Sequence, residues 1–472
     1  MAPNHQDAES LGASSIEEPS VSDNNSVGET TNSQSGNSGR SSDEDQVNDA
    51  ARLENIVISS AKLFVLFFLL SLAVVVSYFW YVLTKGMEED SYEDDFNEYS
   101  SKLVTIFFER VETKVLAAST LAVSLTSHVS HSSSMEWPLV SFPNFERRTA
   151  GARRLTSATS VWFSPLVLEE NRSLWEIYAT ENEGVLQSNF SDPFDPHGEH
   201  ADEDDEIGSP YRQVDWQVDE GIYRIADTVA VPQEFGQTPL YAPIWQSAPV
   251  SLTKTNAMYN QLSEDFRREV IGAMVEFKTP FFSKSQLTGD DSSLVNDNKE
   301  EPNVYLYHPI YDTVQKTTVV GGLTFDLDWS SFWRETGNGI PGPLTVILEN
   351  NCGQAYTYTL RGGNSHVEFV SEGETYYDEA SEGLAVETDY ADFAALFGYD
   401  VDQENACSYR VKVYPTKDFE EEYITNRPIL SSVGVGSIFL LTAAVFIFYD
   451  CLLERRQARV MQSAKRSNAI VR

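Results

Sequence analysis

The densest group of side chains able to bind a metal lies in the segment His197–Glu206, HGEHADEDDE. Its histidines and carboxylates supply the nitrogen and oxygen ligands that divalent cations prefer. Their spacing matches no defined ligand set, such as the loop of an EF-hand. The sequence therefore favours a solvated acidic loop here, with a divalent-metal site as the alternative.

A second motif, Gly337–Gly342 (GNGIPG), has the glycine spacing of a dinucleotide-binding loop. Such a loop requires a strand before it and a helix after it. Here a short helix is expected at Trp329–Arg334 and a strand at Leu344–Leu348, and Pro341 lies inside the motif. We therefore interpret it as an ordinary loop.

Other catalytic signatures are missing from the sequence, which contains no nucleophile elbow, HExxH, CxxC or P-loop. Asp326 and Asp328 lie two residues apart on a predicted strand and so share one of its faces. Solvation or capping of a hairpin explains this pair better than acid–base catalysis. The sequence thus predicts no catalytic residue, cofactor or metal site in residues 85–427.

The elements that organise the chain are two apolar segments. Ile429–Tyr449 has 21 residues without a charge, and as a helix it measures roughly 30 Å, the thickness of a bilayer core. The following tail carries six basic residues and one acid, which predicts a cytoplasmic location. Leu63–Leu83 is the other predicted span, with Tyr78, Trp80 and Tyr81 at its far end as an aromatic belt.

These spans define the predicted domains and topology. Residues 1–60 form a disordered acidic tail, 61–84 and 428–450 are transmembrane helices, 85–427 form an extracytoplasmic domain, and 451–472 form a basic cytoplasmic helix. Both termini are then cytoplasmic, with the plasma membrane as the expected location. The sequons at Asn171 and Asn189 fall in the outside segment and predict glycosylation. The net charge of −39 argues against a nucleic-acid partner.

Cysteine usage is sparse, with three residues in the chain. Cys352 and Cys407 are the pair available within the predicted outside domain, whereas Cys451 lies at the membrane edge. An oxidising compartment favours a Cys352–Cys407 disulfide. The alternative is two isolated buried thiols.

The outside domain is predicted to begin with a long helix, which is followed by mixed strands and helices. Apolar residues step by three and four from Glu88 to His131, which predicts an amphipathic helix. A further helix is expected at Asn256–Phe277. The sequence also predicts an antiparallel hairpin, formed by strands at Val304–Tyr311 and Thr317–Leu327. Further strands are predicted at Leu344–Leu348, Tyr356–Leu360, His366–Val370 and Tyr409–Tyr414, with a helix at Tyr390–Phe397. This order indicates an α+β sensor domain similar to PAS-like extracytoplasmic folds.

Aromatic residues near the hairpin are the candidate ligand-binding residues. Tyr241, Trp245 and Tyr307 are predicted to line a site for a small extracellular ligand. Packing in the core is the alternative role for all three.

The tail carries a narrow apolar stripe at steps of seven, three and four: Leu453, Val460, Met461, Ala464, Asn468 and Val471. A parallel coiled coil that continues the second span fits this spacing and predicts a homodimer or a dimer with a longer relative. An interfacial helix held by anionic lipid is the alternative.

Several runs resemble the receptor-type guanylate cyclases of diatoms. They are Pro243–Pro249 followed by Asn256, Leu348–Tyr358 (LENNCGQAYTY), Tyr414–Glu420 (YPTKDFE), Tyr449–Gln457 (YDCLLERRQ) and Val460–Val471 (VMQSAKRSNAIV). The resemblance implies a CHASE-like outside sensor and an inside cyclase domain that makes cGMP from GTP with metal-binding aspartates. This chain stops at Arg472, where the family would continue into that domain. We therefore expect the sensory half of such a receptor, with no catalytic domain in this chain.

Two functional hypotheses follow. The first is a transmembrane receptor that binds an extracellular ligand and relays it through the second span. The second is a non-signalling membrane glycoprotein for adhesion or scaffolding.

Overall fold

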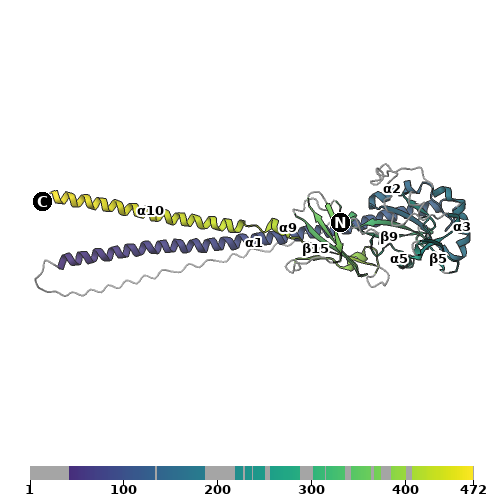
Figure 1. Ribbon diagram of the computed structural model, residues 1–472, viewed down its shortest axis with the longest axis horizontal. Helices are drawn as coiled ribbons and strands as arrows, with labels where there is room; N and C mark the ends of the chain where they lie inside the picture. The colour runs from purple at the N-terminus through teal and green to yellow at the C-terminus, as the bar shows by residue number, and fades with distance from the viewer. Residues whose placement is uncertain are drawn as a thin grey trace, which may run out of the picture. The chain divides into compact units, whose positions relative to one another are not determined.

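The computed structural model describes residues 42–132, 135–186, 218–226, 229–236, 238–249, 256–287, 301–313, 315–334, 342–362, 366–373, 384–399 and 407–470. These residues divide into two compact units. One comprises the described parts of Met1–Ala73 and Phe439–Arg472, and the other is Val74–Ile438. Figure 1 shows the elements of each unit.

The first unit consists of the N-terminal part of helix α1 (Ser42–Ser130) and the C-terminal part of α10 (Arg427–Ile470). Lys62 Nζ contacts Asp450 Oδ1 at 2.7 Å and Glu454 Oε1 at 3.0 Å. Ala73 and Ala443 are buried, whereas most of the large apolar side chains along both helices are exposed. Both helices are long and apolar enough to cross a membrane. The structure thus contains the two predicted apolar helices.

Helix α1 begins nearer the N-terminus than the sequence predicted. Residues 42–60 were expected to belong to a disordered tail, yet α1 begins at Ser42. Ala50, Ala51, Arg52, Leu53 and Glu54 are good helix formers next to the apolar segment, and they extend its helix toward the N-terminus. Residues 1–41 lie outside the described residues.

The second unit contains a six-stranded sheet with the order β6-β1-β10-β9-β7, in which β8 also pairs with β9. Its strands are β1 (Ser160–Pro165), β6 (Gln246–Ala248), β7 (Phe281–Phe282), β8 (Gln286–Leu287), β9 (Pro302–Tyr311) and β10 (Val319–Asp328). Helix α5 (Asp265–Phe277) contacts β9 and β7, and α2 (Phe145–Thr156) contacts β6 and β1. The predicted hairpin is confirmed as β9 and β10, which pair antiparallel.

A second, five-stranded antiparallel sheet has the order β13-β12-β11-β15-β14. It comprises β11 (Leu344–Asn350), β12 (Ala355–Arg361), β13 (His366–Glu372), β14 (Val386–Glu387) and β15 (Tyr409–Pro415). Short helices α6 (Ser330–Trp333) and α8 (Tyr390–Ala395) lie beside it in the chain. The four predicted strands in this region and the helix at Tyr390 are confirmed, so the second unit is mixed helix and sheet.

Further elements complete the unit. Short strands β2 (Val167–Leu168) and β5 (Leu240–Tyr241) pair with each other, as do β3 (Tyr223–Ala226) and β4 (Val229–Pro232). They accompany α3 (Arg172–Glu181) and the 3-10 helices η1 (Glu169–Asn171), η2 (Glu183–Leu186), η4 (Val218–Glu220) and η5 (Gln261–Ser263). The expected helix at Asn256–Phe277 is correct from Asp265 onward. Residues 256–264 instead form turns and η5, because Asn260 accepts backbone hydrogen bonds from Ala242 and Leu262.

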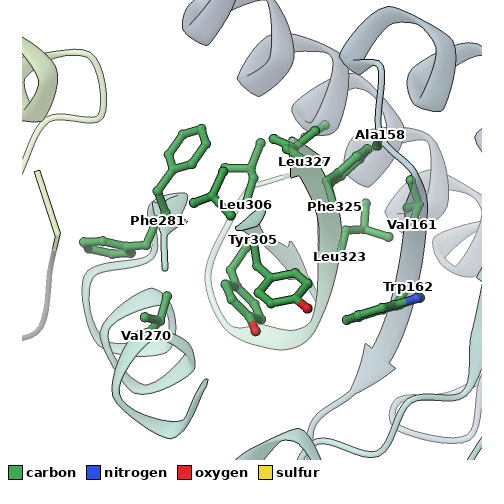
Figure 2. Packing of buried hydrophobic residues seen from close by; sticks show 14 of the residues in the cluster. Ala158, Val161, Trp162, Val270, Phe281, Tyr305, Leu306, Leu323, Phe325 and Leu327 are labelled. Atoms are coloured by element: carbon green, nitrogen blue, oxygen red, sulfur yellow. The ribbon is translucent and has the colours of Figure 1, made fainter. Parts of the chain in front are cut away.

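The hydrophobic core joins α1 to the sheets. Phe107 of α1 stacks on Trp333 with ring centroids 4.8 Å apart, and it also contacts Trp329. Figure 2 shows residues of β1, β9 and β10 packed together with Val270 of α5 and Phe281 of β7. The alternating residues Leu323, Phe325 and Leu327 of β10 are fully buried. Both faces of the six-stranded sheet are therefore covered.

The Cys352–Cys407 disulfide is present, with the Cα atoms 5.7 Å apart, which confirms that prediction. It joins the β11–β12 turn to the start of β15. Asn351 reinforces the same link, since its N–H donates to the Ser408 carbonyl and its Oδ1 accepts from the Ser408 N–H at 2.9 Å.

Candidate functional site

One face of the six-stranded sheet carries polar and aromatic side chains. Strand register aligns Trp162 of β1 with Thr324 of β10, and Thr324 with Tyr307 of β9. Asp326 is aligned in the same way with Ser160 and Tyr305. Partners across an antiparallel pair point to the same side, so these residues share a face opposite Leu323, Phe325 and Leu327. We call this the polar face.

Arg267 of α5 lies over the polar face and is 2 % exposed. Its guanidinium carbon is 4.6 Å from the ring centroid of Tyr305 and 5.4 Å from that of Trp162. Its Nε donates to Glu264 Oε2 at 2.6 Å. A buried cation is costly unless it is paired, and the aromatic rings and Glu264 together provide that pairing.

Gln261 connects η5 to the same face. Its Nε2 donates to Ser164 Oγ at 2.6 Å, and its Oε1 accepts from Thr324 Oγ1 at 3.4 Å. The segment that contains Gln261 therefore covers the polar face at the side of β1 and β10.

Asp326 is one of two acidic groups on this face, together with Asp328. Burial raises the pKa of its carboxyl to about 6, while hydrogen bonds from Thr159 and Ser160 and the charge of Arg267 act in the opposite direction. Asn303 Nδ2 also donates to Asp326 Oδ1, at 3.3 Å. The carboxyl can therefore change its protonation state near neutral pH.

The segment Asn256–Asn260 is strained and incompletely hydrogen-bonded. Met258 is fully buried with φ 72°, a left-handed conformation that is uncommon for residues other than glycine. Its N–H donates to the Ile244 carbonyl at 2.8 Å, and the Ile244 N–H donates to the Tyr259 carbonyl at 2.8 Å. These bonds hold the strained backbone in place, and such strain is concentrated at functional sites.

Two amide groups on this segment have unused hydrogen-bonding capacity. Asn256 and Asn260 are 1 % and 0 % exposed, and the Nδ2 of each lacks a partner among the residues that the structure describes. A buried donor without a partner costs about 1–3 kcal/mol, so such groups are rare in native proteins. Each of these two amides therefore has a donor available for a further hydrogen-bond acceptor.

The three predicted ligand-binding residues are all buried, but they point to different neighbours. Tyr241 accepts a hydrogen bond from Arg172 Nη1 at 3.3 Å and donates one to Glu169. Trp245 donates to Ser141 Oγ at 2.8 Å. Tyr307 alone lies on the polar face, although the backbone from Tyr241 to Trp245 runs beside Asn256–Gln261. Their role in ligand binding stays a prediction.

Sequence reasoning did not single out Asn256, Asn260, Gln261 or Arg267 as site residues. A signal existed for Arg267, because Val270, Ile271 and Met274 follow it at steps of three, four and seven. This spacing places a charged residue on the apolar face of its helix. For the asparagines, no local pattern distinguishes a buried amide from one in an exposed turn.

A second group of ionisable side chains lies where β10 passes into α6. Lys114 of α1 is 2 % exposed, and its Nζ donates to Ser331 Oγ at 3.0 Å and to the Thr156 carbonyl. Burial lowers the pKa of this amine to about 7, while the charge of Asp328 raises it. Lys114 thus joins α1 to α2 and α6.

The remaining residues singled out from the sequence are the two sequons, the acidic segment, the glycine-rich motif and the Asp326–Asp328 pair. Asn171 is half-buried at the end of η1, while Asn189, His197–Glu206 and Gly337–Pro341 lie outside the described residues. Asp326 and Asp328 share a face of β10, as expected. Within the described ranges, no group of three or more His, Cys, Asp or Glu is placed to hold a metal ion.

A comparison of the chain with models of known protein families found no match, and a comparison with curated proteins also found none. The resemblance to diatom guanylate cyclases therefore stays a hypothesis based on the sequence runs given above.

Proposed function

We propose that this chain is a two-span membrane receptor whose outside domain binds a small ligand at the polar face. The observation that carries the proposal is the pair of buried amide donors on the strained segment Asn256–Asn260. A ligand with carbonyl, carboxylate or ring-nitrogen acceptors would satisfy them. Gln261, which directly follows this segment, bonds to Ser164 and Thr324 of the polar face, where Arg267 and Asp326 also lie.

A chain of contacts from the end of β10 to the start of the second apolar helix supports signalling. Trp329, which follows β10, donates to Ser285 Oγ at 2.8 Å and packs on Tyr409 of β15 with ring centroids 4.6 Å apart. Strand β15 leads into α9 (Lys417–Tyr423), and Phe419 of α9 packs against Tyr92 and Phe96 of α1. Packed side chains therefore connect the end of β10, β15, α9 and α1.

The route ends where α9 passes into α10. The Glu88 carboxylate of α1 accepts hydrogen bonds from the Thr425 N–H at 3.1 Å and from its hydroxyl at 2.8 Å. Thr425 Oγ1 in turn accepts from the Arg427 N–H at 3.1 Å, at the start of α10. A ligand acts through this route only if it binds one arrangement of the helices more tightly than the other.

We further propose that the outside domain is a PAS-like sensor of the CHASE type, with both termini of the chain in the cytoplasm. The long membrane-proximal helix and antiparallel sheets support this assignment, as does the basic stretch after the second span. The resemblance to diatom guanylate cyclases supports control of cGMP synthesis as the output. Reading the transcript past the codon for Arg472 tests this: a cyclase reading frame supports it, and an immediate stop codon contradicts it.

Ligand binding is tested by a thermal-shift screen of small polar metabolites against the full chain in nanodiscs. Asn256→Leu removes an unpaired donor, so we expect stability to be kept or raised while the ligand-induced shift in Tm is lost. Asn182→Ala is the matched control, because its side chain bonds within its own helix end to the Tyr178 carbonyl. A ligand that shifts the Tm of Asn256→Leu as it does the wild type would contradict this site.

A further inference from the structure

Lys114 occupies an apolar position on the inward face of α1. The buried residues of this face follow one another at steps of four and three, and all but the lysine are apolar: Phe107, Val111, Lys114, Ala118 and Leu121. Lysine is almost never fully buried unless its amine is paired. The partners of this amine therefore decide whether it carries a charge.

Both hydrogen-bond partners of the Lys114 amine are neutral. Its Nζ donates to the Thr156 carbonyl at the end of α2 and, at 3.0 Å, to Ser331 Oγ of α6. The Ser331 hydroxyl donates its own proton to the Asp328 carbonyl at 2.6 Å, so its oxygen is an acceptor for the amine. In the part of the chain that the structure describes, no carboxylate forms an ion pair with Lys114.

The two nearby acids are bound to other groups. Asp328 Oδ2 accepts from Ser330 Oγ at 3.1 Å and from Arg334 Nη2 at 2.7 Å. Glu301, which precedes β9, accepts from the Ser330 N–H at 2.6 Å. Burial and the charge of Asp328 raise the pKa of the Glu301 carboxyl, which weakens it as a counter-ion.

The remaining charged groups around Lys114 do not compensate a positive charge. Arg110, one turn earlier on α1, and Arg334, which follows α6, both oppose protonation of the amine. The buried charged residues of α2 are Glu146 and Arg153, which have opposite signs. Burial is the largest effect, and it lowers the pKa of Lys114 to about 7 although the charge of Asp328 acts in the opposite direction.

The neutral amine fits this site better than the ammonium ion does. A neutral amine has two N–H groups, one for the Thr156 carbonyl and one for Ser331 Oγ. The ammonium ion adds a third N–H and a full charge, for which the site offers the face of Phe332, with the ring centroid 4.4 Å from Nζ. A buried cation without an anionic partner is costly. Protonation therefore favours an open form in which the amine reaches water.

We propose that Lys114 forms a pH-sensitive contact between α1, the end of α2 and α6, which is closed when the amine is neutral and opens when it is protonated. The contact lies on the same face of α1 as Phe107, whose ring packs on Trp333 and Trp329. Trp329 is also the first residue in the chain of contacts that leads to the second apolar helix. A role for protons as a second input of the receptor rests on the proposed function, whereas the contact itself does not.

Hydrogen exchange of the full chain in nanodiscs tests the contact. The amides to follow are those of Phe332 and Arg334, which bond to the carbonyls of Trp329 and Ser330. The pKa of Lys114 is about 7 in the closed form and returns to its ordinary 10.5 when the amine is solvated. The open form binds more protons between these two values, so its population should rise roughly 70-fold from pH 9 to pH 6.5. Protection factors, which correct for the pH dependence of exchange itself, should fall by the same factor.

Three variants assign this change to Lys114. Lys114→Met keeps the length of the side chain but binds no proton, so protection at α6 should be equal at pH 9 and pH 6.5. Lys114→Arg stays charged at every pH, so protection should be low at both. Lys102→Met is the matched control, because Lys102 is an exposed lysine of the same helix. It should keep the pH dependence of the wild type.

Equal protection of the wild type at pH 9 and pH 6.5 would overturn the proposal, whether or not the variants fold. A Lys114→Met variant with the pH dependence of the wild type would also overturn it, because a carboxyl group such as Asp328 or Glu301 would then be responsible. The assay uses no ligand. Its result is therefore independent of the ligand-binding test on Asn256→Leu.

Discussion

Removal of the Cys352–Cys407 disulfide should destabilise the unit Val74–Ile438 by about 4 kcal/mol. The two cysteines are separated by 55 positions in sequence. Closing a loop of that length removes chain entropy from the unfolded state worth about 4 kcal/mol at room temperature. The native turn should survive the change, because Asn350 and Asn351 keep their hydrogen bonds to Cys352, Gln354 and Ser408.

The effect should extend beyond the turn. Gln354 Nε2 donates to the Ser285 carbonyl at 2.9 Å, and its Oε1 accepts from the Ser285 N–H at 3.0 Å. These bonds join the β11–β12 turn to the β7–β8 connection of the six-stranded sheet. A looser turn should therefore lower the cooperativity of unfolding between the two sheets.

The assay is denaturant unfolding of the full chain in nanodiscs, followed by tryptophan fluorescence. The double variant Cys352→Ala/Cys407→Ala and the reduced wild type should lose similar stability, and added reductant should not affect the variant further. A loss below about 1 kcal/mol would refute the chain-entropy reasoning. It would mean that the unfolded chain already holds these segments together.

Three further predictions test single contacts. Burial raises the pKa of Asp326 to about 6. The folded chain therefore keeps a proton on this carboxyl that the unfolded chain loses above roughly pH 4. As a result, the free energy of unfolding falls as the pH rises from about 4 to about 6. Asp326→Asn should reduce this fall in the free energy of unfolding by up to about 3 kcal/mol, measured by denaturation at a series of pH values. If the free energy of unfolding of the variant depended on pH as that of the wild type does, the pKa of about 6 would be contradicted. A Cβ at Gly436 would lie 2.9 Å from Ser77 Oγ, so Gly436→Ile should cost about 1–3 kcal/mol in a thermal-stability assay in nanodiscs, whereas an equally stable variant would exclude close packing there. Glu88→Ala should remove the bonds to Thr425 and cost about 1 kcal/mol, seen as faster hydrogen exchange in the first turn of α10; wild-type exchange would argue against this link.

The sequence by itself determined the features that depend on local pattern. The uncharged run of 21 residues at Ile429–Tyr449 predicted an apolar helix, and α10 contains it. Alternation along Leu323, Phe325 and Leu327 predicted β10 within about two residues at each end, because a half-buried strand has a period of two. Composition predicted the disulfide, since the predicted outside domain has two cysteines and therefore one possible pair.

Tertiary structure decided the candidate site. The division of the strands into two separate sheets depends on which distant strands pair, such as β1 with β10 and β11 with β15. Likewise, Asn260 is buried because its side chain binds the backbone of Ala242, eighteen residues earlier. Periodicity reports which side of an element faces the core. It does not report which residues from different elements meet there, because that depends on long-range packing that no local spacing records.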